Sequence, residues 1–427
     1  MTHKKKLFFK LGAVALAACL AAFISCTDEV TSDNSLAMYE PYMVPKVLLQ
    51  DAGIPIVSIE TKNNQFILDK ENWVDASIKI GNAEDESWNM EPTDMQIRGR
   101  GNTTWGCAKK PFAIKFDEKT KICGMPKHKR WVLIANYLDH SHLKNEMAFY
   151  LSRQLGLDYT VRGKFVNLVL NGNYVGLYWL GEQIKVNSNR VDIDEDNDYL
   201  IEMDTYFDET WKFKSQIKKF PVQVKNDDTM NDAKLENLKE KINAIEGILY
   251  SPYFPYTDNT KTVYDDTFKN SVDIDSFAKF YLVNEIMGNV DLKLPRSAYF
   301  TFENAQGILK AGPVWDFDWS ASEWMNTLIV NDSIYFDALF KTREFNSKIK
   351  ELLESDLVTE EKIKQEIKDL SEKLEKSALL DRLRWEESFV VNEQMNLFPF
   401  EDYKKHVNEL ESCLTTRIRV VKSQLIK

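Results

Sequence analysis

The chain has 427 residues, of which 44% are hydrophobic, a share typical of a globular protein and too high for a disordered one. Its formal net charge at pH 7 is −11. Because neutralisation of nucleic-acid phosphates needs clustered lysine and arginine, this acidic balance argues against a nucleic-acid partner. The length allows two lobes around a sizeable core.

Residues 1–25 have the layout of a signal peptide: a lysine-rich start, an apolar stretch over residues 11–24, and small residues at the end. The apolar stretch is too short and too rich in alanine for a convincing membrane span. The run Ile24-Ser25-Cys26 resembles a lipobox. We therefore expect cleavage before Cys26, lipid on Cys26 that anchors the protein to a membrane, and localisation in a bacterial cell envelope, on its periplasmic face or at the cell surface.

Residues 26–50 are expected to form a lipidated flexible tether, since the part up to Ser35 is rich in serine, aspartate and asparagine. The acidic pair Asp28-Glu29 resembles the surface-export signal of lipoproteins in Bacteroides-like bacteria. Beyond the tether we expect three regions. They are a β-rich N-lobe over 51–205, a helical C-lobe over 206–340, and a C-terminal helical extension over 341–427.

The first half is patterned mainly as β-structure. A helix is expected over 141–155, where leucines and a methionine recur every four residues until Gly156. Asn171-Gly172 lies between two apolar runs and predicts a hairpin. The expected strands are 54–59, 76–80, 95–98, 111–116, 131–135, 165–170, 174–180 and 199–203.

Helical periodicity dominates the second half, over 235–249, over 274–287 with a stop at Gly288, and over most of 359–426, with Thr359 as the N-cap. The predicted class is therefore α+β. A β-rich lobe that contains one helix and precedes a helical lobe is the layout of protein-kinase-like folds. This is an analogy of architecture, which does not establish an activity.

Three cysteines, Cys107, Cys123 and Cys413, remain after the lipidated one. They allow at most one disulfide in an exported protein, most simply Cys107 to Cys123. The histidines are scattered, and His140 and His142 would not share a helix face. We therefore predict no zinc site.

Residues 98–115 combine glycines with Arg98, Lys110 and Lys115. Glycines allow close approach of the backbone to phosphate, and nearby cations neutralise it. An ordinary tight turn with exposed basic residues explains the same pattern, and the residues alone favour that reading.

Two acidic segments follow. Asp291 comes directly after a helix that Gly288 ends, where a carboxylate could accept a proton from an attacking hydroxyl, or form an ordinary Asx turn. Asp316 and Asp318 alternate with large aromatics; on a strand they would share one face. Carboxylates in such an apolar run are costly unless paired or metal-bound, and Mg²⁺ suits one or two carboxylates plus phosphate oxygens.

The sequence resembles the CotH kinase family. The resemblance covers about residues 55–390 in the family's order. It rests on Arg98-Gly99-Arg100-Gly101-Asn102-Thr103-Thr104-Trp105, Lys109-Lys110-Pro111-Phe112-Ala113-Ile114-Lys115-Phe116, Gly124-Met125-Pro126, Trp131-Val132-Leu133-Ile134-Ala135-Asn136, Asn171-Gly172-Asn173-Tyr174-Val175-Gly176-Leu177-Tyr178, Glu182-Gln183-Ile184-Lys185 and Trp315-Asp316-Phe317-Asp318.

The resemblance implies an atypical, bilobal protein-kinase-like fold that phosphorylates serine, or threonine, of a protein substrate of unknown identity with ATP and Mg or Mn. Carried over by position, Asp291 resembles the catalytic aspartate. Asp316 resembles the metal-binding aspartate, with Asp318 as the competing choice. Lys110 or Lys115 resembles the phosphate-contacting lysine, beside Arg98 in the first motif. Glu182, or its rival Glu146, resembles that lysine's partner.

One departure concerns the second metal. Kinases usually place an asparagine about five residues after the catalytic aspartate, whereas residues 292–297 contain none and Ser297 is a poor substitute. Two alternatives to a protein kinase therefore stand: a catalytically weak or inactive surface binding module, and an enzyme that transfers a nucleotidyl group instead of phosphate.

Overall fold

The computed structural model describes residues 36–251, 256–258, 261–263, 266–321, 326–391 and 403–426. The expected signal peptide, Cys26 and most of the expected tether lie outside these residues. Within the described ranges, none of the helices combines the length and the apolar character needed to span a bilayer.

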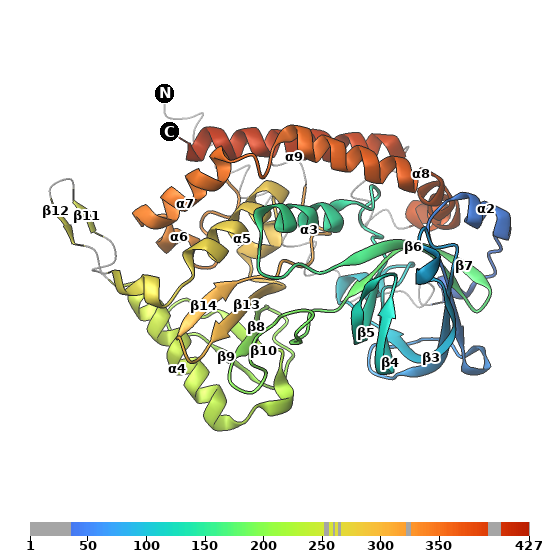
Figure 1. Ribbon diagram of the computed structural model, residues 1–427, viewed down its shortest axis with the longest axis horizontal. Helices are drawn as coiled ribbons and strands as arrows, with labels where there is room; N and C mark the ends of the chain where they lie inside the picture. Colours follow the sequence, from blue (N-terminus) through green and yellow to red (C-terminus); the bar gives the residue numbers. More distant parts are fainter. Residues whose placement is uncertain are drawn as a thin grey trace.

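The N-terminal part is a closed barrel in the order β1-β2-β3-β4-β5-β7-β6 (Figure 1). Neighbours pair antiparallel except β1 and β6, which pair in parallel and close the barrel. Alternating residues such as Ile97, Ile114 and Trp131 face the interior. The strands are β1 (Ile56–Thr61), β2 (Val74–Gly81), β3 (Met90–Gly99), β4 (Phe112–Ile122), β5 (Met125–Ile134), β6 (Gly163–Leu170) and β7 (Asn173–Glu182).

The expected helix between strands is α3 (Lys144–Leu155), and it ends at Gly156, whose φ of 70° is the left-handed conformation that glycine adopts without steric cost. The expected hairpin joins β6 and β7 through Asn171 and Gly172, both with positive φ.

The C-terminal part combines helices with a five-stranded sheet in the order β14-β13-β8-β10-β9. The sheet corrects the expected division at residue 205, because β8 pairs with β13 and β10 instead of joining the barrel. Its other strands are short, and their patterns predict no sheet. The strands are β8 (Tyr199–Met203), β9 (Lys212–Lys214), β10 (Pro221–Val224), β13 (Ala298–Glu303) and β14 (Ile308–Ala311); β11 (Tyr256–Asp258) and β12 (Lys261–Val263) form a separate hairpin.

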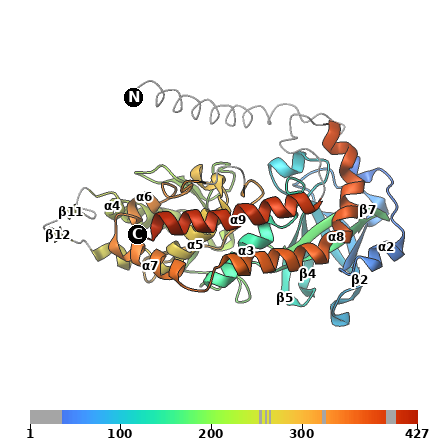
Figure 2. The same cartoon turned by 90° about the horizontal axis from the view of Figure 1, so that it is seen from above.

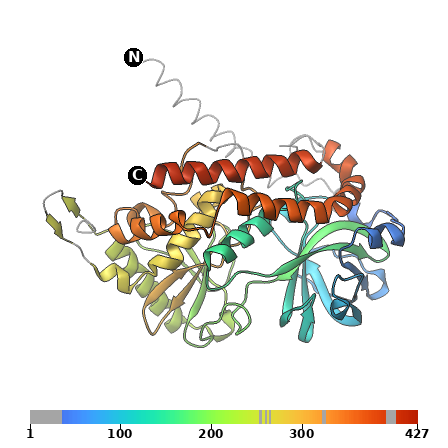
Figure 3. The same ribbon diagram turned by 45° about the horizontal axis from the view of Figure 1, so that its top comes forward.

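Two long helices run side by side across both parts, as Figures 2 and 3 show for α8 and α9. α8 packs against β7, and α9 packs against α5, so the pair fastens the barrel to the second sheet. Glu285 of α5 and Arg417 of α9 form a fully buried ion pair. The helices are α2 (Lys46–Asp51), α4 (Asp232–Leu249), α5 (Ile274–Met287), α6 (Phe336–Leu339), α7 (Arg343–Glu354), α8 (Glu360–Val391) and α9 (Tyr403–Leu425).

The disulfide that the sequence allowed between Cys107 and Cys123 does not form, because both residues are buried as free cysteines. Cys107 lies five residues before β4, whereas Cys123 directly follows this 11-residue strand, so the whole strand separates them along the chain.

A buried ion pair joins α8 to the barrel. Lys109 Nζ lies 2.6 Å from Asp381 Oδ1 and donates to the carbonyl of Leu177, whose own N–H donates to the same carboxylate at 2.7 Å. The lysine is fully buried and the aspartate almost so. Lys109, which precedes the lysine proposed from the motif, therefore has a structural role in this fold.

We expect Lys109→Met to lower the free energy of unfolding by about 3 kcal/mol or more, because it leaves Asp381 as an unpaired buried charge. Chemical denaturation measures the loss. A second substitution, Asp381→Asn, removes that charge but keeps an acceptor for the Leu177 N–H, so the double variant should recover part of the stability. Equal losses in the single and double variants would contradict a charge-pairing role.

Candidate active site

Three chain segments leave the second sheet at one edge. Met203, the last residue of β8, pairs with Ala298, the first residue of β13. β14 runs antiparallel to β13 and ends at Ala311, opposite Phe300. The residues after β8, before β13 and after β14 therefore meet at this edge.

Arg296 and Ser297 connect three aspartates there. The Ser297 N–H donates to Asp204 Oδ2 at 3.0 Å, and its hydroxyl donates to Asp316 Oδ2 at 3.4 Å. Arg296 Nη1 lies 3.7 Å from Asp291 Oδ1. The fold thus brings together Asp291 and Asp316, which the sequence analysis singled out, and adds Asp204, which it missed because no local motif marks the end of β8.

Asp291 is held by the end of α5. Gly288 ends that helix with a φ of 62°, and the buried Asn289 accepts the N–H of Asp291 at 3.2 Å, which begins the 3₁₀-helix η8 (Val290–Lys293). Desolvation, followed by the charge of Asp316, raises the pKa of Asp291 to about 6. A carboxylate that titrates in this range is suited to accept a proton at neutral pH.

Asp316 and Asp318 do not alternate on a strand, which corrects the expectation that they share one face. β14 ends at Ala311, and Asp316 has a φ of 64°, a left-handed conformation that turns the chain. The Asp316 side chain is consequently exposed, whereas Asp318 is buried. Asp318 Oδ1 accepts from Asn145 Nδ2 at 2.7 Å, and the Phe317 N–H donates to the carbonyl oxygen of the same amide at 2.9 Å.

The carboxylates repel one another. Desolvation, followed by the charge of Asp316, raises the pKa of Asp318 to about 7. Desolvation also raises the pKa of Asp316 and that of Asp204; Asp204 contributes to the shift of Asp316. Crowded acids of this kind lower the stability of the folded state when they ionise and are stabilised by a cation.

The raised pKa of Asp318 makes stability depend on pH. The folded protein keeps this proton up to about pH 7, whereas the unfolded chain releases it near pH 4, so stability falls as the pH rises between these values. Asp318→Asn keeps an oxygen that accepts from Asn145 but removes the charge. We expect its melting temperature to exceed that of the unchanged protein by several degrees at pH 8 and to match it near pH 4. A constant difference across this range would contradict the assignment.

Arg100 lies just beyond the end of β3, and its charge acts on two of the acids. Its guanidinium lies 5.5 Å from the ring centroid of Trp315. Burial lowers the pKa of Arg100, while the charge of Asp316, and less strongly that of Asp318, favours its charged form. Arg100 belongs to the first glycine-containing motif, and the alternation Arg98-Gly99-Arg100 was the only sequence signal that pointed to it.

Most of the glycine-rich motif packs on itself. The position that a Cβ of Gly99 would take lies 2.4 Å from the Trp105 ring, so this glycine makes room for a tryptophan of the same motif. Lys110 is buried, and its ammonium donates to the carbonyls of Trp105 and Cys107 at 2.8 and 3.1 Å. These contacts match the tight-turn interpretation of the motif.

The other two candidate cations lie together on the outer face of the barrel. Arg98, Lys115 and Arg130 lie 4.7, 5.3 and 5.0 Å from the ring centroid of Trp73. Arg98 Nε is buried and has no hydrogen-bond partner among the described residues. The charge of Arg98 contributes to a lowered pKa of Arg130, after desolvation. This cluster is positively charged and lies two residues before Arg100 along β3.

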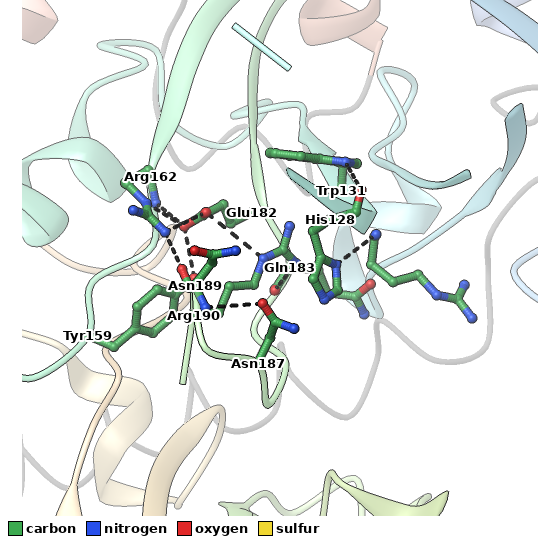
Figure 4. Close-up of polar contacts among 10 residues, drawn as sticks. His128, Trp131, Tyr159, Arg162, Glu182, Gln183, Asn187, Asn189 and Arg190 are labelled. Atoms are coloured by element: carbon green, nitrogen blue, oxygen red, sulfur yellow. Dashed lines mark hydrogen bonds and ion pairs between the residues drawn. The ribbon is translucent and has the colours of Figure 1, made fainter. Parts of the chain in front are cut away.

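Glu182 has arginine partners instead of the expected lysine. It is fully buried at the end of β7, and Arg162 donates to both of its carboxylate oxygens at 3.0 and 2.8 Å. Tyr159 donates at 2.9 Å, and Arg190 Nε lies 3.9 Å away (Figure 4). Glu146 binds Arg153 and the indole N–H of Trp179 at 2.6 and 2.9 Å. Neither glutamate contacts Lys110 or Lys115.

Three of the scattered histidines, His140, His142 and His406, line a cavity of about 30 Å³ between the barrel, α8 and α9. In the described ranges, however, no group of three or more His, Cys, Asp or Glu side chains is arranged to hold a metal ion.

Comparison with protein-family models gives a match to the family described as CotH kinase protein, over residues 97–421. Comparison with curated proteins finds no match. The family match begins within β3, just before Arg98, and includes Asp204, Asp291, Asp316 and the two long C-terminal helices.

Proposed function

Because the chain belongs to the CotH kinase family, we propose that it transfers phosphate from ATP to a serine or threonine hydroxyl of an envelope or surface protein. The observation that carries this proposal is the meeting of Asp204, Asp291 and Asp316 at one sheet edge, where the charge of Arg100 from the barrel acts on Asp316. Phosphoryl transfer needs such an arrangement of acids and a cation more than it needs covalent chemistry from the protein.

The proposal divides the roles as a bilobal kinase-like fold does. The barrel supplies positive charge for the nucleotide phosphates through Arg100, and through Arg98 and Lys115 beside Trp73. The second sheet and α5 supply the acids. Lys110 is the less suitable of the two candidate lysines, because backbone carbonyls already occupy its ammonium.

The residues fit a divalent metal ion. Asp316 is exposed, and Ser297 hydrogen-bonds to both Asp316 and Asp204. Desolvation raises the pKa of each acid, and the charge of Asp204 adds to the shift of Asp316, so a bound cation would favour their ionised forms. Mg²⁺ is commonly held by one or two carboxylates together with phosphate oxygens, so Asp316 with Asp204 would be sufficient protein ligands. When bound, Mg or Mn would supply the positive charge that neutralises the phosphate oxygens of ATP.

Asp291 would accept the proton of the attacking hydroxyl. The hydroxyl oxygen forms a bond to the γ-phosphorus, the bond from that phosphorus to the β–γ bridging oxygen breaks, and ADP leaves. Arg296, 3.7 Å from Asp291, holds the carboxylate in place. Residues 292–297, which follow Asp291, contain no asparagine that could bind a second metal. Asp204 would take that role, because Ser297 hydrogen-bonds to both Asp204 and Asp316.

We further propose that the protein acts in the cell envelope, anchored through lipid on Cys26. The support is the lipobox-like run at the end of the signal-like segment. Replacement of Cys26 by serine should release the protein into the soluble fraction. Unchanged fractionation with membranes would contradict the anchor.

A binding module without catalysis is the second candidate function. It is favoured by the partners of the two motif residues: Lys110 donates to backbone carbonyls and Glu182 binds arginine, so these two do not form the ion pair that the family resemblance implied. In this case the scaffold would bind a partner at the envelope and leave its acids unused.

Labelled ATP separates these possibilities. The Cys26→Ser protein is incubated with Mg or Mn and with ATP labelled at either the γ- or the α-phosphate. We expect γ-label on protein serine or threonine and no α-label. Transfer of the α-label to protein would identify a nucleotidyl transferase. Transfer of neither label would support the binding module.

A further inference from the structure

One end of the molecule exposes six large apolar side chains on two neighbouring segments. Segment 36–51, which ends with α2, exposes Leu36, Met43, Val47 and Leu48, of which Met43 is 75% accessible to solvent. α8 exposes Leu379 and Leu383, each about half accessible and one turn apart on the same helix face. Exposed apolar groups that gather in this way mark an interaction surface.

Polar contacts hold the two segments together. Lys376 Nζ donates to the carbonyl of Asp51 at 2.9 Å, and Arg384 Nη2 donates to the carbonyls of Ala37 and Glu40 at 2.7 and 3.1 Å. Leu379 and Leu383 lie on α8 between these two anchoring residues. Figure 1 shows α2 beside the later part of α8, at the end of the molecule away from β13 and β14.

The segment has its apolar groups on both sides. Met38 and Leu49 are buried against the protein, whereas Val47 and Leu48 project outward from the six-residue helix α2. A surface helix in water normally presents polar groups on its outer side. The outward residues therefore indicate that this side of the segment has an apolar partner.

We propose that this apolar surface docks on the lipid bilayer that carries the anchor at Cys26, an inference that rests on the proposed lipidation. Leu36 follows Cys26 by ten residues, so the chain between them reaches at most about 36 Å and keeps the surface close to that bilayer. The high local concentration set by a short tether makes a weak contact effective. The net charge of −11 gives no general attraction to anionic lipids, so apolar contact carries the docking.

Docking would also orient the site. With α2 against the bilayer, the sheet that contains β8, β13 and β14 lies on the other side of the barrel from α2, away from the bilayer (Figure 1). The substrate class that suits this orientation is a protein segment presented from solution or from a neighbouring protein, and not a lipid headgroup.

The test uses the mature lipidated protein in phosphatidylcholine vesicles. Val47→Cys places a thiol on the surface for an environment-sensitive fluorophore; Cys107, Cys123 and Cys413 are buried. Ile217→Cys, at a position that is 47% accessible and lies between β9 and β10, is the matched control. Lipids with a nitroxide near the headgroup should quench the probe at 47 several-fold more than the probe at 217. Equal quenching would overturn the proposal.

Flotation of the same vesicles distinguishes docking of the apolar surface from lipid anchoring at Cys26. Protein that floats with the vesicles but shows no preferential quenching at 47 keeps the anchor and overturns docking; protein that does not float overturns both. In the Val47→Cys background, Leu48→Asp should reduce the quenching without a change in melting temperature. The fluorescence of the probe at 47 could instead shift with the surface density of protein on the vesicles and not with the lipid. That result would show that a second copy of the protein covers the apolar surface, and it would also overturn the proposal.

Discussion

Asp316→Asn is expected to abolish phosphate transfer and to weaken Mg-dependent binding of ATP by about tenfold or more, because it removes the exposed carboxylate proposed to hold the metal. Isothermal titration with ATP, with and without Mg, measures the affinity. The fold should persist, since asparagine tolerates the φ of 64° at this position as well as aspartate does.

The substitution also removes repulsion with Asp204 and Asp318, so the melting temperature should not fall. Asp158→Asn is the matched control: Asp158 is an exposed aspartate that pairs with Lys310 at 3.6 Å, and its loss should change neither binding nor transfer. If Asp316→Asn bound ATP with unchanged Mg-dependent affinity, another carboxylate would have to hold the metal.

Asp291→Asn should keep ATP binding and lower the turnover number by about a hundredfold or more, since positioned proton acceptance contributes at least that much. The two substitutions should therefore have different measured effects. Asp316→Asn weakens the binding of metal and nucleotide, whereas Asp291→Asn slows the chemical step. Asp332→Asn is the control, because Asp332 pairs with Lys293 of the same 3₁₀-helix at 3.4 Å but is exposed.

The pH dependence gives a second test of Asp291. Its carboxylate must be ionised to accept a proton, so the turnover number should rise with pH through about 6 and then level off. Positive charge bound beside Asp316 would move the midpoint to lower pH. A folded Asp291→Asn variant with full activity, or a rate independent of pH in this range, would contradict the catalytic role.

Local patterns predicted much of the fold. Regular apolar spacing with a glycine stop identified α3 and α5, and Asn171-Gly172 identified the β6–β7 hairpin. Their signals are contained in a few neighbouring residues. Barrel closure is different: β1 pairs with β6 across more than 100 residues, and no local signal specifies that pairing.

Only part of the candidate site could be predicted, because local motifs mark some of its residues whereas long-range strand pairing positions the others. Asp291 and Asp316 belong to recognisable motifs, and the fold brings them to one sheet edge. Asp204 became a neighbour only through the pairing of β8 with β13, which the sequence analysis assigned to separate lobes. The alternation expected for Asp316 and Asp318 failed because a left-handed residue after β14 breaks the strand.

The most direct test of the central claim, that these aspartates and Arg100 bind ATP with a divalent metal, is the melting temperature of the Cys26→Ser protein as a function of ATP–Mg concentration. A ligand that binds only the folded state raises stability by mass action. We predict a rise that depends on both ATP and metal and is lost in Asp316→Asn. No shift at millimolar nucleotide with either Mg or Mn would contradict the account and favour a binding module.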